Sequence, residues 1–392
     1  MSVVGKYAEF AVSCRTKGHS EDVLHHAKRA LIDWFACTLP GGLEEPAVLM
    51  TKALDEDIGR GKSTLLPQGE RATTRTAALI NGTASHIIEF DDIYRDGLFH
   101  PGAPIISAAL AVAEMTNSSG VDLLRAVIAG YEVANSIAEA VNPHHYEWWH
   151  TTATVGFFGA SASAAVLLGL NSERTGHALA TAGTMAAGLQ QAFRADAMSK
   201  PIHSGRAAEG GVLSALLAKN GVTGAFDILE GERGFGNAMS ANVDWTKSVD
   251  MLENNHSITK ITQKNHAACG HVHAIIDALN HIRNTNEINP TKIKKIKIGS
   301  YQKTYEICHN PNPKTPYEAK FSSEYCAAMA IIKGRALRSD DFSKENLQAP
   351  SVKDLMNIVD LKIDEGCQNV FPKARSANVE VVTLDDEVFA HF

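Results

Sequence analysis

Features that would assign a chain to several common classes are missing from these 392 residues. No apolar stretch is long enough to span a bilayer, and the richest, Val155 to Leu170, is mostly Gly, Ala and Ser. The N-terminus lacks the charged start, long apolar run and cleavage site of a signal peptide. The six cysteines have no framework spacing. We therefore expect a protein of the reducing cytoplasm with no membrane partner.

Signatures of several enzyme and binding classes are missing as well. No GxGxxG follows a strand-like segment, and Gly234-Phe235-Gly236 is too short for a dinucleotide site. There is no P-loop and no GxSxG elbow, which counts against phosphoryl transfer and α/β-hydrolase chemistry. The formal net charge of -7 argues against nucleic acid as a partner. It leaves room for a local basic pocket that binds a small anion.

Helical periodicity dominates the chain up to residue 262. Residues 21–38 place Leu24, Leu31 and Phe35 on one face, with two acids near the start, where the helix dipole favours them. Further helices are predicted over 104–116, 121–142, 153–169, 172–193 and 206–219. Many of them are rich in small residues that let helices approach closely, so we predict a compact bundle.

The pattern changes near residue 263. Thr291–Ser300 and Asn378–Leu384 have the β-branched character of strands, with a hairpin partner from Val388. An apolar helix is predicted over 323–333, and the charge-rich stretches 245–262 and 335–350 are interpreted as connections or surface elements. The predicted fold class is mainly α: a large all-helical bundle domain over 1–262 and a smaller α+β domain over 263–392.

Basic residues stand just before three predicted helix starts. His100 precedes the helix near 104, His150 precedes the helix at 153, and Lys200 and His203 precede the helix at 206. Unpaired backbone N–H groups and the helix dipole attract anions at such positions. Histidine is also tolerated at an ordinary helix start, so each segment alone has a purely structural interpretation. The repetition favours a shared anion pocket.

Neighbouring residues extend this pattern. Ser204 suits an N-cap and Arg206 adds charge on what we predict to be the first helical turn. Asp91 and Asp92 lie ahead of His100, where they would orient the histidine or bind a hydroxyl. A loop with solvated acids after a helix is the alternative interpretation of that pair.

The segment from Lys264 to His273 is dense in potential ligands. Cys269, His271 and His273 have a spacing that can bind zinc, but no second ligand pair is evident. We favour an active-site turn that enters a helix near residue 272, with Lys264 facing the anion and no bound metal.

Three further residues follow in the second domain. Lys320 precedes the predicted helix at 323 and repeats the pattern of the first domain. Tyr301 and Tyr305 follow the first strand and are candidates to supply a phenol, although both also suit a strand surface.

Taken in order, these segments resemble the MmgE/PrpD family. It includes 2-methylcitrate dehydratases, cis-aconitate decarboxylases and iminodisuccinate epimerase. The resemblance covers nearly the whole chain. The segments that carry it are EFDD…HPG, WWHTTATVGFFGASASAAVLLGL, MSKPIHSGRAAEGGVLSALLAKNG, KNHAACGHVH and EAKFSSEY.

The resemblance implies a large helical domain and a smaller α+β domain with the site between them, no cofactor, and a homodimer. It also implies that a C-terminal segment returning to the helical domain is missing here. The catalytic residues that it implies are Asp91, His100, His150, Lys200 and Lys264. The residues expected to bind substrate are Asp92, His203, Arg206, His273, Tyr305 (or Tyr301) and Lys320.

The resemblance further implies a lyase for a small di- or tricarboxylate, with lysines neutralising carboxylates and histidines moving protons. A carbon-oxygen lyase of the 2-methylcitrate dehydratase type is our first expectation. A cis-aconitate decarboxylase is the runner-up, since AACGHVH is closer to the fungal members, and a polycarboxylate epimerase is the third alternative. A non-catalytic binding protein and a zinc protein centred on Cys269 are alternatives of other classes.

Overall fold

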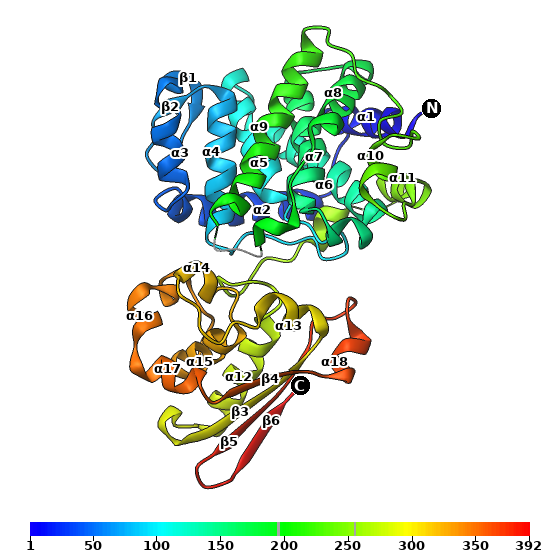
Figure 1. Cartoon of the computed structure of the whole chain (residues 1–392). Coiled ribbons are helices and arrows are strands. Elements are labelled where there is room, and N and C mark those ends of the chain that lie inside the picture. Colours follow the sequence, from blue (N-terminus) through cyan, green and yellow to red (C-terminus); the bar gives the residue numbers. More distant parts are fainter. Residues whose placement is uncertain (194–196, 255) are drawn as a thin grey trace. The chain divides into compact units, whose positions relative to one another are not determined.

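The computed structural model describes residues 1–193, 197–254 and 256–392. Contacts divide the chain into two compact units, Met1–Gln263 and Lys264–Phe392 (Figure 1). The chain is mainly α-helical, with its larger sheet confined to the second unit, which confirms the predicted fold class.

The first unit, here called the helical unit, is a bundle. Its helices are α1 (Val3–Ser13), α2 (Glu21–Gly41), α3 (Ala47–Ala53), α4 (Thr74–Ile87), α5 (Gly102–Thr116), α6 (Gly120–Val141), α7 (Thr151–Leu167), α8 (Ser172–Met185), α9 (Ser199–Lys219), α10 (Phe235–Met239) and α11 (Trp245–Asn254). Short 3₁₀ turns are Asp55–Asp57, His144–Glu147, Gln190–Phe193 and Ser257–Lys260. A small antiparallel hairpin, β1 (Ile58–Thr64) with β2 (Arg71–Ala72), was not expected in this unit.

Small residues let the central helices of the bundle come close together. A Cβ atom at Gly205 of α9 would lie 2.1 Å from the carbonyl oxygen of Leu79 on α4. A Cβ atom at Gly82 of α4 would lie 2.8 Å from the Cα atom of Gly205. Because the two helices approach so closely, side chains from the last turn of α4 lie near those from the first turns of α9. No helix in the described part of the chain is both long and apolar enough to cross a membrane.

The second unit, here called the α+β unit, has a four-stranded sheet in the order β4-β3-β5-β6. β3 pairs in parallel with β4 and antiparallel with β5, and β5 forms the predicted hairpin with β6. Its strands are β3 (Ile293–Ser300), β4 (Val359–Ile363), β5 (Ala377–Thr383) and β6 (Val388–His391). Its helices are α12 (His273–Asn286), α13 (Gln302–Cys308), α14 (Pro316–Ala319), α15 (Ser323–Lys333), α16 (Lys344–Gln348), α17 (Pro350–Met356) and α18 (Glu365–Val370), with 3₁₀ turns at Pro290–Lys292 and Ser339–Phe342.

The two stretches interpreted as connections or surface elements contain helices, so they are not simple connections. In α11, Trp245 packs against the main core and the side chains of Val249 and Leu252 are buried. Their spacing is helical, but the polar residues between them hid it. The stretch 335–350 likewise contains α16 and a 3₁₀ turn.

Two predicted helix bounds also differ from the structure. α8 ends at Met185 rather than 193, because the chain leaves the helix to pair with another segment. The carbonyl of Gly188 accepts the backbone N–H of His150 at 2.9 Å, and Leu189 bridges to Trp149. α9 begins at Ser199 rather than 206.

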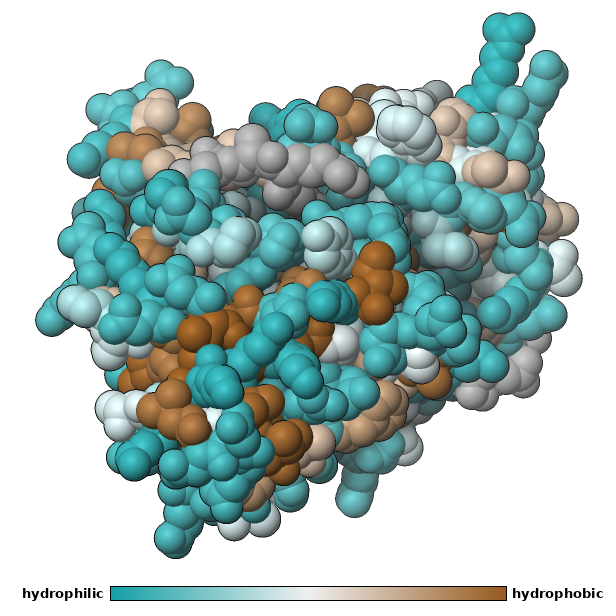
Figure 2. Space-filling view, turned by 60° about the horizontal axis from the view of Figure 1, so that its bottom comes forward, coloured by the Kyte–Doolittle hydropathy of each residue, from teal (hydrophilic) through white to brown (hydrophobic). Residues whose placement is uncertain are grey.

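The surface carries scattered apolar side chains. In Figure 2, which shows one face, hydrophobic residues form separate groups within a mainly hydrophilic surface. Among the exposed apolar side chains are Ile32, Leu43, Val388 and Phe392. Apolar atoms supply much of any folded protein's surface, so single residues of this kind need no special explanation.

Candidate active site

Four segments of the helical unit bring histidine, aspartate and lysine side chains together. They are the last turn of α4, the connection from α4 to α5, the start of α7 and the first turns of α9. Contacts between their side chains define a cluster, here called the histidine cluster. Its members are His86, Asp91, His100, His150 and His203.

Asp91 lies between two imidazoles. One of its oxygens, Oδ2, is 2.6 Å from Nδ1 of His86 and 3.3 Å from Nδ1 of His100. Asp91 is 2% exposed and His86 is fully buried. The carboxylate accepts a hydrogen bond from the ring N–H of His86, which fixes the orientation and the tautomer of that ring. Its charge also lies close to the imidazole of His100.

His150 and His203 form the second part of the cluster. Their Nδ1 atoms are 3.1 Å apart, so one ring must donate and the other must accept. Burial, followed by the positive charges that His86 and His203 would carry, holds the pKa of His150 well below its usual range. Burial, and then His86 and Lys200, lower the pKa of His203 to about 4. Both rings are therefore neutral at pH 7.

Lys200 lies beside the cluster and forms a buried ion pair with Glu89. The two side chains are at most 5% exposed. Glu89 follows α4 in a left-handed conformation with φ of 57°, which turns the chain sharply towards α9. Since buried charges require partners, this pair ties the exit of α4 to the start of α9.

The third basic segment is not placed before a helix as predicted. Lys200 and His203 lie within α9, and Ser204 is no N-cap: its hydroxyl donates to the carbonyls of Gly82 and Pro201. Pro201 belongs to the first turn of α9. Proline is tolerated in a first turn because the N–H groups there have no helical partner.

Arg206 is also placed differently, since it lies beyond the first turn of α9. Its guanidinium pairs with Glu209 one turn further along the helix, and its side chain is 52% exposed. The expected contribution of Arg206 to charge at a helix start is therefore wrong. Its predicted contact with substrate remains a prediction.

The first two basic segments are placed as predicted. His150 is the N-cap residue of α7, and His100 lies two residues before the start of α5.

Asp92 accepts hydrogen bonds from two groups of the protein. The donors are the backbone N–H of Gly102 at 2.9 Å and the Tyr131 hydroxyl at 2.8 Å. Burial, and then the charge of Asp33, raise the pKa of Asp92 well above its ordinary value. These contacts let Asp92 hold the start of α5, and its predicted contact with substrate remains a prediction.

In the α+β unit, Lys264 and Lys320 are both buried lysines. The carbonyl of Lys320 accepts the backbone N–H of Cys269 at 3.0 Å, which joins its segment to the stretch from Lys264 to His273. His273 is the first residue of α12, as predicted, and its Nε2 lies 3.1 Å from the carbonyl oxygen of Ala268. Burial is the main cause that lowers the pKa of His273 to about 3.

The two candidate tyrosines differ in their surroundings. Tyr301 is fully buried, its hydroxyl is 2.8 Å from Nδ1 of His271, and its ring stacks on Phe371 at 4.4 Å. Tyr305 is 38% exposed and stacks on His309. The phenol that is held in a defined position is that of Tyr301.

The zinc hypothesis gains no geometric support. Within residues 1–193, 197–254 and 256–392, the one group of three or more His, Cys, Asp or Glu with ligand atoms mutually within 4.8 Å is His86, Asp91 and His100. Cys269, His271 and His273 do not form such a group, and the contacts of His271 and His273 are to Tyr301 and Ala268.

Two members of this region were not singled out from the sequence. His86 and Glu89 lie in SHIIEFDD, where His86 falls on the last turn of a helix and Glu89 precedes the aspartates. No local spacing marks either residue, because their partners lie on α7 and α9. The pair of acids at 91 and 92 was the nearest signal.

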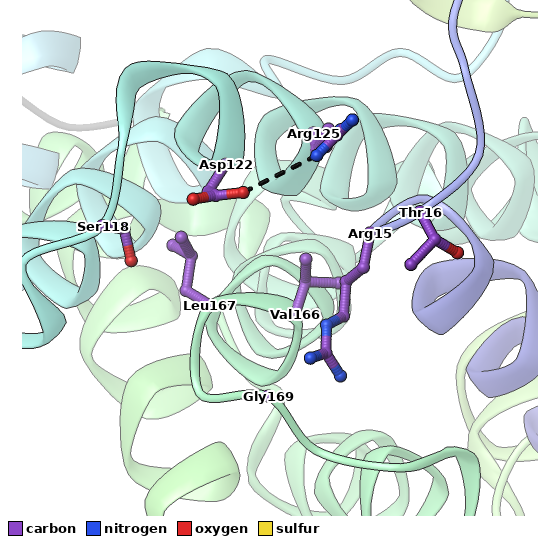
Figure 3. Close-up of a pocket in the computed structure, with 8 residues that line it drawn as sticks. All are labelled: Arg15, Thr16, Ser118, Asp122, Arg125, Val166, Leu167 and Gly169. Carbon is purple, nitrogen blue, oxygen red and sulfur yellow. Dashed lines mark ion pairs between the residues drawn. The ribbon is translucent and has the colours of Figure 1, made fainter.

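A pocket of the helical unit lies apart from these residues, at the ends of α1, α6 and α7 (Figure 3). Its volume is about 280 Å³, and no member of the histidine cluster lines it. Arg125 pairs with Asp122 on the same helix at 3.7 Å, and Arg15 reaches the carbonyl of Leu170 at 3.4 Å. Its charges therefore have partners within the protein.

Comparisons with known proteins agree with the resemblance. Residues 5–248 match the model of the MmgE/PrpD N-terminal domain and residues 266–391 match that of the MmgE/PrpD C-terminal domain. A cis-aconitate decarboxylase-like protein of Aspergillus oryzae is 25% identical over 362 residues, covering 86% of this chain and 74% of that protein. The cis-aconitate decarboxylases of Homo sapiens and Mus musculus are 28% and 26% identical, covering 88% and 92% of this chain and 73% and 76% of their own lengths.

Proposed function

The chain belongs to the MmgE/PrpD family, and we propose that it is a lyase acting on a small di- or tricarboxylate through its own histidine and lysine side chains. The observation that carries the proposal is the histidine cluster with Lys200 beside it. It gathers, in one buried place, the residue types that move protons next to a carboxylate.

The state of each group suggests its role. His150 and His203 have lowered pKa values and are neutral at pH 7, so either can take a proton. His100, oriented by Asp91, is the second proton-transfer group of the proposal. Lys200 and Lys264 are proposed to neutralise substrate carboxylates and stabilise the electron-rich intermediate.

Decarboxylation of cis-aconitate is the reaction to test first, because three relatives bear names of that activity. The bond between carbon and one carboxylate breaks, CO₂ leaves, and the electron pair moves into the unsaturated acid. The carbon then takes a proton from His100, the second proton-transfer group of the proposal. The sequence alone put 2-methylcitrate dehydration first. That reaction uses a base for the α-proton and an acid for the departing hydroxyl, so it remains the second candidate, ahead of epimerisation.

The test is a screen of purified protein with cis-aconitate, 2-methylcitrate, citrate and an aspartate-derived dicarboxylate, with products identified by NMR and released CO₂ measured. We expect turnover of one of them, reduced about 100-fold or more by Lys200→Ala and by His150→Ala, the range for loss of a charge-stabilising group and of an acid–base group. Thermal melts of the variants report on folding. Absence of turnover with every compound would contradict the lyase proposal.

The proposal includes activity without a cofactor. Dialysis against a chelator is expected to leave turnover unchanged, with no stoichiometric metal by elemental analysis. Loss of activity on dialysis, restored by a divalent cation, would instead favour a metal at His86, Asp91 and His100.

Location in the cytoplasm is also part of the proposal. All six cysteines are buried and no disulfide joins them in the described structure, in keeping with a reducing compartment. Fractionation of the source cells tests it, with recovery in the soluble cytoplasmic fraction as the expected result.

A further inference from the structure

His86 has contacts with both parts of the histidine cluster. Its Nδ1 is 2.6 Å from Asp91, and its ring lies 4.9 Å from that of His100, edge on. On its other side its ring stacks on His150, with centroids 5.6 Å apart and planes within 21° of parallel. His150 in turn is paired with His203. His86 is therefore the residue that joins the Asp91–His100 pair to the His150–His203 pair.

The hydrogen bond to Asp91 determines which nitrogen of His86 carries the proton. An ionised carboxylate can only accept, so Nδ1–H donates and a neutral ring leaves Nε2 without a proton. Among the described residues, Nε2 of His86 is buried and has no hydrogen-bond partner. Leaving a buried polar atom without a hydrogen bond destabilises the fold, so a purely structural position would favour an apolar residue.

The position of His86 in the fold adds a second reason. It lies on the last turn of α4, and the close packing of Gly82 against Gly205 holds that turn beside α9. The charged and titratable groups around it come from every neighbouring segment: Asp91 and His100 from the α4–α5 connection, His150 from α7, and Lys200 and His203 from α9.

We propose that His86 is a positioning residue of the reaction. It donates Nδ1–H to Asp91 and so holds this carboxylate beside His100, and its ring face fixes the orientation of His150. This inference rests on the proposed function, because His100 and His150 are the proton-transfer groups there. His86 itself transfers no proton to substrate in this scheme.

Two substitutions separate a positioning role from simple packing. His86→Asn keeps a donor where Nδ1–H lies, whereas His86→Leu fills the space without one. We expect His86→Leu to lower kcat about 10- to 100-fold with little change in KM, the range found when a group that orients a site ligand is lost. His86→Asn should recover most of that loss. Equal impairment of both variants, or full kcat in His86→Leu, would overturn the proposal.

The matched control is His177→Asn. His177 is a partly buried histidine of α8 in the same unit, and its Nδ1 accepts the backbone N–H of Gly224 at 3.1 Å, away from the cluster. Its substitution removes a buried ring of equal size and should leave kcat within about twofold of the unsubstituted protein. A thermal melt of each variant shows whether the helical unit is folded.

A second readout needs no substrate. With labelled histidine, NMR of the imidazole nitrogens reports the tautomer and the titration of each ring. We expect His86→Leu to shift the tautomer balance of His100 and His150, and His177→Asn to leave both unchanged. Unchanged signals in His86→Leu would overturn the inference even if turnover were never found. If the substrate screen finds no turnover but the NMR signals of His100 and His150 change in His86→Leu, only the proposed function is overturned.

Discussion

At the scale of single residues, the helical unit contains buried carboxylates that need partners within the protein. Glu89 and Asp91 are both almost fully buried carboxylates. One faces the ammonium of Lys200 and the other faces the imidazoles of His86 and His100. Burying a charge is costly unless it is paired and hydrogen-bonded, so these contacts account for how the acids are tolerated.

The pair of Lys200 and Glu89 leads to a prediction on stability. Lys200→Met removes the cation that Glu89 faces, and we expect the free energy of unfolding of the helical unit to fall by about 3–5 kcal/mol. Adding Glu89→Leu should restore part of that loss, because the uncompensated charge is then removed. Urea titration followed by circular dichroism measures both effects.

An exposed ion pair supplies the control for this experiment. Lys294 and Asp386 pair at 2.7 Å, with side chains that are 54% and 73% exposed. Lys294→Met should cost at most about 1 kcal/mol. Equal stability losses in Lys200→Met and Lys294→Met would contradict the assignment of a buried, structurally required pair.

His203 leads to a prediction on pH. Its pKa is about 4 in the folded protein, compared with an ordinary value of about 6.5 when unfolded. Between these values the unfolded state binds more protons, so the contribution of His203 to stability is complete above pH 6.5 and is lost as the pH falls towards 4. We expect His203→Asn to flatten the decline of stability over this window, as measured by urea midpoints. An identical decline in both proteins would contradict the assignment.

At the scale of elements, the contact between α4 and α9 determines where the cluster forms. The last turn of α4 carries His86, and the first turns of α9 carry Lys200 and His203. Glycines at 82 and 205 remove the side chains that would keep these helices apart. A closely packed helix pair is a rigid support, which suits groups that must be held in a defined orientation.

Gly205→Val tests this contact. The new Cβ would lie 2.1 Å from the carbonyl oxygen of Leu79, so α4 and α9 must separate. We expect a loss of about 1–3 kcal/mol in stability, the usual cost of overpacking, and a larger fractional loss of turnover than of folded protein. Gly120→Ala is the control, because a Cβ there meets nothing within 4 Å. Full activity in Gly205→Val would show that the helix contact does not position the cluster.

At the scale of the whole molecule, the chain combines a helical bundle with a separate α+β unit. The family match extends over both, since one domain model covers residues 5–248 and the other covers residues 266–391. The candidate residues are distributed over both units as well, with Lys264 and Lys320 in the second. A substitution in either unit is therefore informative about the proposed reaction.

The homodimer remains a prediction, and it concerns the molecule as a whole. The mass of one chain is 42.1 kDa. We expect light scattering coupled to size-exclusion chromatography to give twice that mass at micromolar concentration, since soluble oligomers are most often twofold homodimers. A mass that stays at that of one chain over the accessible concentrations would refute the expectation.

Most helices and strands could be predicted from local patterns in the sequence. The helical spacing of apolar residues predicted α2, α5, α6, α7 and α15, and β-branched alternation predicted β3 and β5. These patterns suffice because a helix or strand is formed by residues close together in the chain. They failed at α11, whose polar residues obscured its helical spacing of apolar residues, and at the start of α9, where Pro201 belongs to the first turn.

The residue types of the candidate site were also readable from the sequence. Asp91, His100, His150, Lys200 and His203 stood out by their position near helix starts and by the family resemblance. Their partners were decided by the tertiary structure alone. His86 meets Asp91 and His150, and Glu89 meets Lys200, because α4, α7 and α9 pack together across long stretches of chain. Such contacts depend on how helices dock, and no local spacing encodes them.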